Sequence, residues 1–260
     1  MAAILMRVGI IGYGWIGKAT HKLFPDAQIY DKYIEEYNKP LENCDIAFLA
    51  VPTPYEGSAD GINCDAVEDA IRECGCDFIV IRSATQPGFA DRMAVKYNKR
   101  IVVQPEYLGE TPNHPFLEME NRHFMILGGE PEDRRKVIEC YHSAYNADVR
   151  IRQVSRLEAE VIKFSENRAI FYKVMQCQEL YDACEAAGID YYTVRDAVYG
   201  DDPRQNLWWT FVYPDARGAN SKCIPKDVYG WCAWAESVGF NPAATLNLLE
   251  YNNTLLTKKV

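Results

Sequence analysis

A glycine-rich turn near the N-terminus constrains the fold of this chain most strongly. Residues 12–17 read Gly-Tyr-Gly-Trp-Ile-Gly, after the apolar run 7–11 and at the start of a segment, 14–24, that we expect to be helical. In such a strand–turn–helix unit the first glycine makes the tight turn and the second lets a pyrophosphate approach the backbone. The third lets helix and strand pack closely. The pattern predicts a dinucleotide-binding domain. The purely structural alternative is a glycine-rich turn that binds no ligand.

A carboxylate follows this turn at the expected spacing. Asp31 ends the second predicted strand, 27–31, and lies 19 residues after Gly12. There it would accept hydrogen bonds from the adenosine ribose and repel a 2′-phosphate, so the sequence favours NAD over NADP. The segment after the third predicted strand is a further candidate for cofactor binding, although its sequence also fits an ordinary turn. The predicted cofactor-binding residues are Gly12, Gly14, Trp15, Ile16, Gly17, Asp31, Lys32, Val51, Pro52, Thr53, Ser83 and Thr85.

Alternating strand and helix signals organise the first part of the chain. The further apolar runs are 45–51, 77–82, 100–103, 123–128 and 148–152, and the helical segments between them are 64–74, 89–97 and 131–145. This alternation is typical of an α/β fold, here a Rossmann-type doubly wound parallel sheet. The run 45–51 is almost continuously apolar, as expected for a strand buried on both faces.

The pattern changes near residue 153. Residues 155–187 contain no Pro, no Gly and no strand signal, with a Ser155–Glu158 capping box at one end and Gly188 at the other. One long helix is therefore predicted. The helical segments that follow are 190–199, 225–238 and 242–257, with a loop-rich stretch at 201–222. We expect residues 1–153 to form the NAD-binding domain and residues 154–260 to form an all-helical substrate and dimerisation domain.

The composition excludes some classes of function. The 260-residue chain has a net charge of −9, which argues against nucleic acid or an anionic membrane as a partner. Its nine cysteines follow no framework, so we expect reduced thiols in the cytoplasm. No segment reaches the length of a membrane span, and we expect no metal site.

Seven segments in order along the chain resemble the UDP-glucose/GDP-mannose dehydrogenase family. They read GYGWIG, AVPTP, RSATQPGF, QPEYLGE, EAEVIKFSEN, DDPR and CIPKD. The resemblance implies an NAD-dependent enzyme that oxidises the primary alcohol of a sugar nucleotide to a carboxylate in two hydride transfers, with UDP-glucose the favoured substrate. It also implies a homodimer. The chain stops about where the family's C-terminal nucleotide-binding domain is expected, so we expect a short form.

The resemblance also implies roles for individual residues. Cys223 matches the catalytic cysteine, and Asp227 matches the aspartate of the following Pro-Lys-Asp. Lys163 and Asn167 match the pair that stabilises the oxyanion. Glu106 and Glu110 match the two acids near the reacting water. This chemistry is coherent, because a thiolate turns an aldehyde into an adduct that still has a hydride to give. A nearby lysine can hold the oxyanion.

Each residue also has an ordinary structural interpretation. A cysteine is most often a small buried hydrophobe, and Glu106 and Glu110 fit ordinary loop acids. Two departures from the family are visible: Ala84 stands where a threonine is expected, and Asn220-Ser221 replaces a double glycine. Two other functions stay open, a one-step hydroxyacid dehydrogenase with Lys163 as the acid/base and a non-catalytic NAD-binding relative.

Overall fold

Seven strands within the described part of the chain form one sheet in the order β2-β1-β3-β4-β5-β6-β7. The computed structural model describes residues 6–109, 123–142, 144 and 148–257. The strands are β1 (Val8–Ile11), β2 (Gln28–Tyr30), β3 (Ile46–Leu49), β4 (Phe78–Ile81), β5 (Arg100–Val103), β6 (Phe124–Gly128) and β7 (Arg150–Val154). The chain leaves β1 first toward β2 and then returns to its other side with β3, so the strand order reverses there. Ligands of open α/β sheets bind at such a reversal.

The central strands are buried on both faces, which explains their continuous apolar sequence. All four residues of β3 are fully buried, and those of β4 are nearly so. The predicted Rossmann-type sheet is confirmed, with one difference in direction. Strand β6 pairs antiparallel with β5, whereas the other neighbours are parallel. Apolar runs carry no information about strand direction, so the sequence could not reveal this junction.

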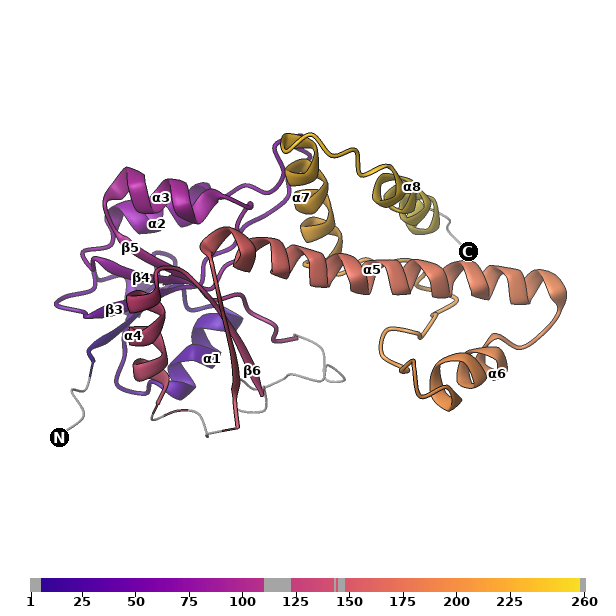
Figure 1. Ribbon diagram of the computed structural model, residues 1–260, viewed down its shortest axis with the longest axis horizontal. Coiled ribbons are helices and arrows are strands. Elements are labelled where there is room, and N and C mark those ends of the chain that lie inside the picture. Colours follow the sequence, from indigo (N-terminus) through magenta and orange to yellow (C-terminus); the bar gives the residue numbers. More distant parts are fainter. Residues whose placement is uncertain (1–5, 110–122, 143, 145–147, 258–260) are drawn as a thin grey trace. The chain divides into compact units, whose positions relative to one another are not determined.

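Helices connect and cover these strands (Figure 1). The first unit contains α1 (Trp15–Leu23), the 3₁₀ turn η1 (Glu35–Tyr37), α2 (Asp65–Glu73), α3 (Phe89–Tyr97) and α4 (Pro131–Tyr141). Helix α3 has the predicted limits, while α4 ends four residues before the predicted residue 145. Gly88 and Asn98 flank α3 in the left-handed conformation, with φ of 87° and 48°.

The predicted long helix is confirmed as α5 (Arg156–Ala187), a continuous helix of 32 residues (Figure 1). Its capping box is present: the Ser155 hydroxyl accepts from the Glu158 backbone N–H at 3.2 Å, and the Ser155 N–H donates to the Glu158 carboxylate at 2.7 Å. Gly188 ends the helix with a φ of +68°, which a glycine adopts without steric penalty. A buried seam of Phe164, Phe171 and Met175 recurs at helical spacing.

The remaining described elements are helical, as predicted. They are α6 (Tyr191–Arg195), the π-helical turn η3 (Asp196–Asp201), α7 (Ile224–Ser237) and α8 (Ala243–Thr257). Tyr191, Tyr199 and Val212 pack against Cys177 and Cys184 of α5 in a small core of their own. No helix in the described residues is long and apolar enough to cross a membrane.

The chain divides into two compact units. The first comprises Met1–Glu56 and Ile62–Lys163, and the second comprises Gly57–Gly61 and Phe164–Val260. The division falls later than the predicted boundary at residue 153, because the first turns of α5 pack on the sheet. Ala159 is fully buried in the core of the first unit, and Ile162 packs against that core.

Candidate functional site

The three glycines of the turn after β1 have three different surroundings. Gly12 has a φ of +89°, and a Cβ there would lie 2.5 Å from the carbonyl oxygen of Ala50. A Cβ on Gly17 would collide with the carbonyl oxygen of Gly12, so helix α1 can approach the turn only without a side chain. A Cβ on Gly14 would meet nothing within 4 Å. The backbone is therefore open at Gly14, at the N-terminus of α1, where the helix dipole favours a phosphate.

Asp31 follows β2 beside this turn. Its carboxylate accepts the backbone N–H of Tyr13 at 2.8 Å and that of Tyr33 at 2.9 Å. These bonds hold the carboxylate next to the glycine turn, and a carboxylate has about four acceptor positions, so it can also accept from a ligand. Lys32 is exposed, and its ammonium group lies 4.9 Å from the centre of the Tyr33 ring.

Other predicted cofactor residues lie at the carboxyl ends of β3 and β4. The Ser83 hydroxyl donates to the Val51 carbonyl at 2.7 Å, which joins the segments that follow these two adjacent strands. Thr53 is buried and Pro52 is exposed. On α1, Trp15 is 47% exposed and Ile16 is partly buried.

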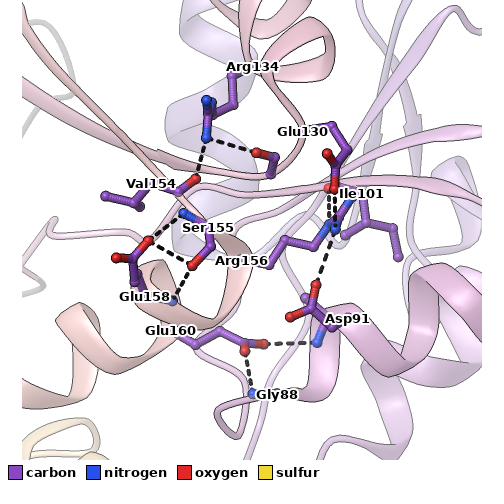
Figure 2. A network of polar contacts seen from close by, with 12 residues as sticks. Gly88, Asp91, Ile101, Glu130, Arg134, Val154, Ser155, Arg156, Glu158 and Glu160 are labelled. Carbon is purple, nitrogen blue, oxygen red and sulfur yellow. Dashed lines mark hydrogen bonds and ion pairs between the residues drawn. The ribbon is translucent and has the colours of Figure 1, made fainter.

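Thr85 lies away from the surface. It is 2% exposed, and its hydroxyl donates to the Glu160 carboxylate at 2.8 Å. The same carboxylate accepts the backbone N–H groups of Gly88 at 2.6 Å and Ala90 at 2.9 Å (Figure 2). Burial raises the pKa of Glu160 to about 7, although these hydrogen bonds act in the opposite direction. Thr85 is thus part of a clamp that joins α5 to the start of α3.

Glu106 differs from a solvated acid that could activate water. It is 6% exposed and forms an ion pair with the fully buried Arg82. Its Oε1 accepts the backbone N–H groups of Tyr107 at 2.6 Å and Leu108 at 2.9 Å. These contacts hold Glu106 against the backbone of the loop after β5, and its expected place at the reacting water stays a prediction. Glu110 lies outside the described residues.

Lys163 occupies the third turn of α5. Its side chain is partly buried, and its ammonium nitrogen lies 4.6 Å from the centre of the Tyr107 ring. Glu160 precedes it by three residues on the same face of the helix. Asn167, four residues later, continues this face and is 6% exposed.

Cys223 is an exposed residue at the N-cap of α7. Helix α7 starts there because Pro225 is compatible with the first turn and the Ser221 hydroxyl accepts the Ile224 N–H at 3.1 Å. The backbone N–H of Asp227 donates to the Cys223 carbonyl at 3.0 Å. The N-terminus of a helix favours negative charge, and hence a thiolate over a thiol.

Asp227 lies one turn into α7 and is 1% exposed. It accepts from the Asn167 side-chain amide at 2.5 Å and pairs with the Lys226 ammonium at 2.6 Å. The structure thus joins Asn167 and Asp227, two of the predicted site residues, by a direct hydrogen bond. Sequence reasoning missed three supporting residues, Arg82, Tyr107 and Glu160. Of these, Glu160 could have been noticed, because it shares a helix face with Lys163 and Asn167.

Residues 157–254 match the sequence profile of the UDP-glucose/GDP-mannose dehydrogenase family, central domain. A UDP-glucose 6-dehydrogenase of Rickettsia conorii is 23% identical over 207 residues, 76% of this chain and 46% of the relative. A UDP-glucose 6-dehydrogenase of Pseudomonas aeruginosa is 26% identical over 217 residues, 77% of this chain and 47% of the relative.

A solved structure shares the fold. A UDP-glucose dehydrogenase from Pyrobaculum islandicum superposes with a TM-score of 0.79 at 19% identity, covering 97% of this chain and 69% of that one. Residues 157–254 and the relatives at 23% and 26% identity link the chain to the UDP-glucose/GDP-mannose dehydrogenase family, and the solved structure shows the shared fold. The predicted resemblance is therefore confirmed, and the chain spans about half the length of the curated relatives it matches.

The segment that matches the central domain of the dehydrogenase family contains Lys163, Asn167, Cys223 and Asp227. It also contains Asn220-Ser221, where the resemblance leads us to expect a double glycine. The displaced threonine of the first unit, Thr85, has a definite place in the structure, on Glu160. The roles of all these residues in a reaction stay predictions.

Proposed function

We propose that the chain is an NAD-dependent nucleotide-sugar dehydrogenase that oxidises the primary alcohol of a sugar nucleotide, with UDP-glucose favoured, to the carboxylate. The observation that carries the proposal is the exposed Cys223 at the N-terminus of α7, within the segment that matches the family's central domain. An exposed thiol at a helix N-terminus is suited to nucleophilic attack, unlike a buried one. Cys223 is exposed, whereas the other eight cysteines are buried or partly buried.

The first unit has the features that a dinucleotide needs. In this proposal the open backbone at Gly14 would receive the pyrophosphate, and Asp31, whose carboxylate accepts the Tyr13 N–H, would accept from a ribose hydroxyl. Bound there, NAD would accept the hydride in each of two oxidations. The carboxylate of Asp31 supports NAD over NADP, because it would repel a 2′-phosphate.

The reaction balances with two molecules of NAD and one of water. The first hydride transfer converts the alcohol to an aldehyde and releases a proton. The Cys223 thiolate then adds to the aldehyde carbon and forms a thiohemiacetal, whose hydride leaves in the second transfer to give a thioester. Water hydrolyses the thioester to the carboxylate and returns the thiol. The sum is one carboxylate, two NADH and three protons.

The other residues would act on charge and position in this proposal. The Lys163 ammonium would stabilise the oxyanion of the adduct, with the Asn167 amide as a second donor. Asp227 holds that amide at 2.5 Å and begins the helix that carries Cys223, so it would act as a positioning residue. Glu106 and Glu110 are the candidates for activating water.

We also propose that the chain forms a homodimer through its helical unit. Large apolar side chains stand exposed there, among them Trp208, Phe211, Phe240 and Leu246, at 39% to 57% exposure. Exposed apolar surface of this kind marks interfaces. Light scattering at micromolar concentration should give twice the chain mass of 29.7 kDa, and a monomer mass would refute the dimer.

Counting NADH per substrate tests the proposed reaction. The purified chain is incubated with UDP-glucose, GDP-mannose and UDP-N-acetylhexosamines, and NADH and the acid product are quantified. We expect two NADH for each acid formed, and a Cys223→Ser variant that binds NAD normally but forms acid at least about a hundredfold more slowly, because a hydroxyl stays protonated at neutral pH. Cys232→Ser, a buried cysteine on the same helix, is the matched control. One NADH per substrate, with Cys223→Ser near the wild-type rate, would favour a one-step dehydrogenase.

A further inference from the structure

A buried asparagine of α8 holds the loop that leads to Cys223. Asn252 is 1% exposed, and its Oδ1 accepts the backbone N–H of Ala219 at 2.7 Å while its Nδ2 donates to the Ala219 carbonyl at 3.2 Å. An amide side chain carries an acceptor oxygen and a donor nitrogen side by side, so it can satisfy the N–H and the C=O of one residue at once. Two bonds to one residue fix the orientation of the Ala219 backbone as well as its distance from α8.

Gly218 makes this close approach possible. Its φ is +80°, and a Cβ there would lie 2.8 Å from the Oδ1 of Asn252 and 3.3 Å from the side chain of Leu256. A residue with a side chain would therefore be strained in its backbone and would push the loop away from the amide. The loop can lie against α8 in this way because the residue before Ala219 is a glycine.

Arg217 joins the same segment to α5. Its Nε donates to the Gln178 side chain at 2.6 Å, and its guanidinium forms an ion pair with Asp182 at 2.8 Å. The Tyr251 hydroxyl of α8 also donates to Asp182, at 3.2 Å. Residues 217–219 are thus fixed on two helices of the second unit, and these bonds do not involve α7.

The segment between this anchor and Cys223 is short. It consists of residues 220–222, which are all exposed. A chain spans at most about 3.6 Å per residue, so a segment of this length leaves little freedom once both of its ends are fixed. The far end is fixed at the start of α7, where the Ser221 hydroxyl accepts the Ile224 N–H at 3.1 Å and the Asp227 N–H donates to the Cys223 carbonyl at 3.0 Å. Cys223 therefore lies between two anchored points.

We propose that Asn252 is a positioning residue for Cys223, because it fixes the start of the loop that presents the thiol at the N-terminus of α7. The inference deepens the proposed function and rests on it for the role of the thiol. A nucleophile has to meet the aldehyde carbon in a defined geometry, and a displacement of about 1 Å can slow a reaction by about a hundredfold. Asn252 acts at a distance from the reacting atoms, through the backbone of Ala219.

The mobility of a nitroxide label on Cys223 tests the inference without substrate or cofactor. The Cys223→Ser protein identifies any signal that comes from other cysteines. Asn252→Ala should shorten the rotational correlation time of the label by about twofold or more, because loop motion on the nanosecond timescale is added once the anchor is lost. Gly218→Ala should have the same effect with Asn252 intact, since its methyl group would displace the loop from the amide.

Two controls on α8 separate this effect from a general loss of stability. Asn253→Ala changes an exposed neighbour of Asn252, and Thr245→Val removes a buried hydroxyl that accepts from Arg168 at 3.0 Å. Thr245→Val should lower the melting temperature, because it leaves a donor without its acceptor, yet both controls should keep the label as immobile as in the wild type. Unchanged mobility in both Asn252→Ala and Gly218→Ala overturns the inference, and so does an equal gain of mobility in Thr245→Val.

Turnover connects the position of the loop with the reaction. Asn252→Ala should form acid from UDP-glucose about tenfold more slowly or worse at saturation. Its KM and its Kd for NAD should stay close to those of the wild type, which is the pattern of a misplaced nucleophile rather than of lost binding. A mobile label together with a wild-type kcat overturns the positioning role. If the wild-type chain forms no acid from any sugar nucleotide, the proposed function fails, while the label still decides whether Asn252 fixes Cys223.

Discussion

The side-chain amide of Asn167 donates a 2.5 Å hydrogen bond to the carboxylate of Asp227, sixty residues later in the chain. The bond joins the middle of α5 to the first turn of α7. Because the Asp227 N–H also donates to the carbonyl of Cys223, one residue organises both the helix that carries the thiol and its contact with α5. The carboxylate is buried, so removing it leaves the Lys226 ammonium without its ion-pair partner.

Asp227→Ala should lower the free energy of unfolding by about 3 kcal/mol, the magnitude for breaking a buried charge pair. Asp227→Asn should lower it less, because the amide still accepts from Asn167. Urea unfolding followed by circular dichroism measures both. Arg204→Ala is the control: that side chain is 85% exposed, and a surface pair contributes less than about 1 kcal/mol. Equal losses in Asp227→Ala and Arg204→Ala would contradict the structural role of Asp227.

Gly14→Ala and Gly17→Ala should separate binding from folding. A Cβ at position 17 meets the Gly12 carbonyl, so Gly17→Ala should unfold at a clearly lower temperature. A Cβ at position 14 meets no protein atom within 4 Å, so Gly14→Ala should melt close to wild type. It should bind NAD more weakly, by roughly tenfold or more, because the methyl group would fill the space proposed for the pyrophosphate. Thermal melts and NAD titration by calorimetry measure the two effects. Wild-type NAD affinity in Gly14→Ala would argue against the cofactor site.

Asp31→Ser should reduce the preference for NAD over NADP. The wild-type carboxylate would repel a 2′-phosphate, whereas serine would not. Titration of each variant with both cofactors gives the ratio of dissociation constants, which we expect to fall by about tenfold or more in Asp31→Ser, since tenfold corresponds to about 1.4 kcal/mol. Asp26→Ser, before β2 and away from the glycine turn, serves as the control. Tighter binding of NADP than of NAD by the wild-type chain would sink the assignment of Asp31.

The first unit should lose stability as the pH rises through the range in which Glu160 titrates. Its pKa is raised from 4.5 to about 7 by burial, so the folded chain holds a proton that the unfolded chain has already released. The contribution of Glu160 is therefore fully present below pH 4.5 and is lost toward pH 7, by about 3 kcal/mol at most. Unfolding in urea at several pH values should show this slope in the wild type and a flatter one in Glu160→Gln. Parallel slopes would contradict it.

Arg82→Met should destabilise the first unit by about 3 to 5 kcal/mol, because it leaves the Glu106 carboxylate buried without its cation. Adding Glu106→Gln should recover part of that loss, since the uncompensated charge is then gone. Hydrogen exchange of the Tyr107 and Leu108 amides is an independent measure, because both donate to Glu106. Additive losses in the double variant would show that the two side chains act separately.

The sequence by itself determined most of the architecture. The Ser155–Glu158 capping box, Gly188 and the apolar runs act on neighbouring residues, so they can be recognised in the sequence. The long helix accordingly begins and ends within a residue of its predicted limits. The glycine turn was equally predictable from the sequence, because only a residue without a Cβ fits at Gly12 and Gly17. The antiparallel direction of β6 could not be predicted, since it depends on where the chain returns to the sheet rather than on the side chains of the strand.

Only the tertiary structure decided what the polar residues near the candidate site do. In the sequence Glu106, Glu160 and Thr85 are an acid, an acid and a hydroxyl at unremarkable positions. In the fold, Glu106 closes an ion pair with Arg82, and Glu160 collects the Thr85 hydroxyl and two backbone N–H groups. The partners are 24 and 75 residues apart in the chain. A buried charge must find its partner in space, and sequence spacing carries no information about which distant group will be there.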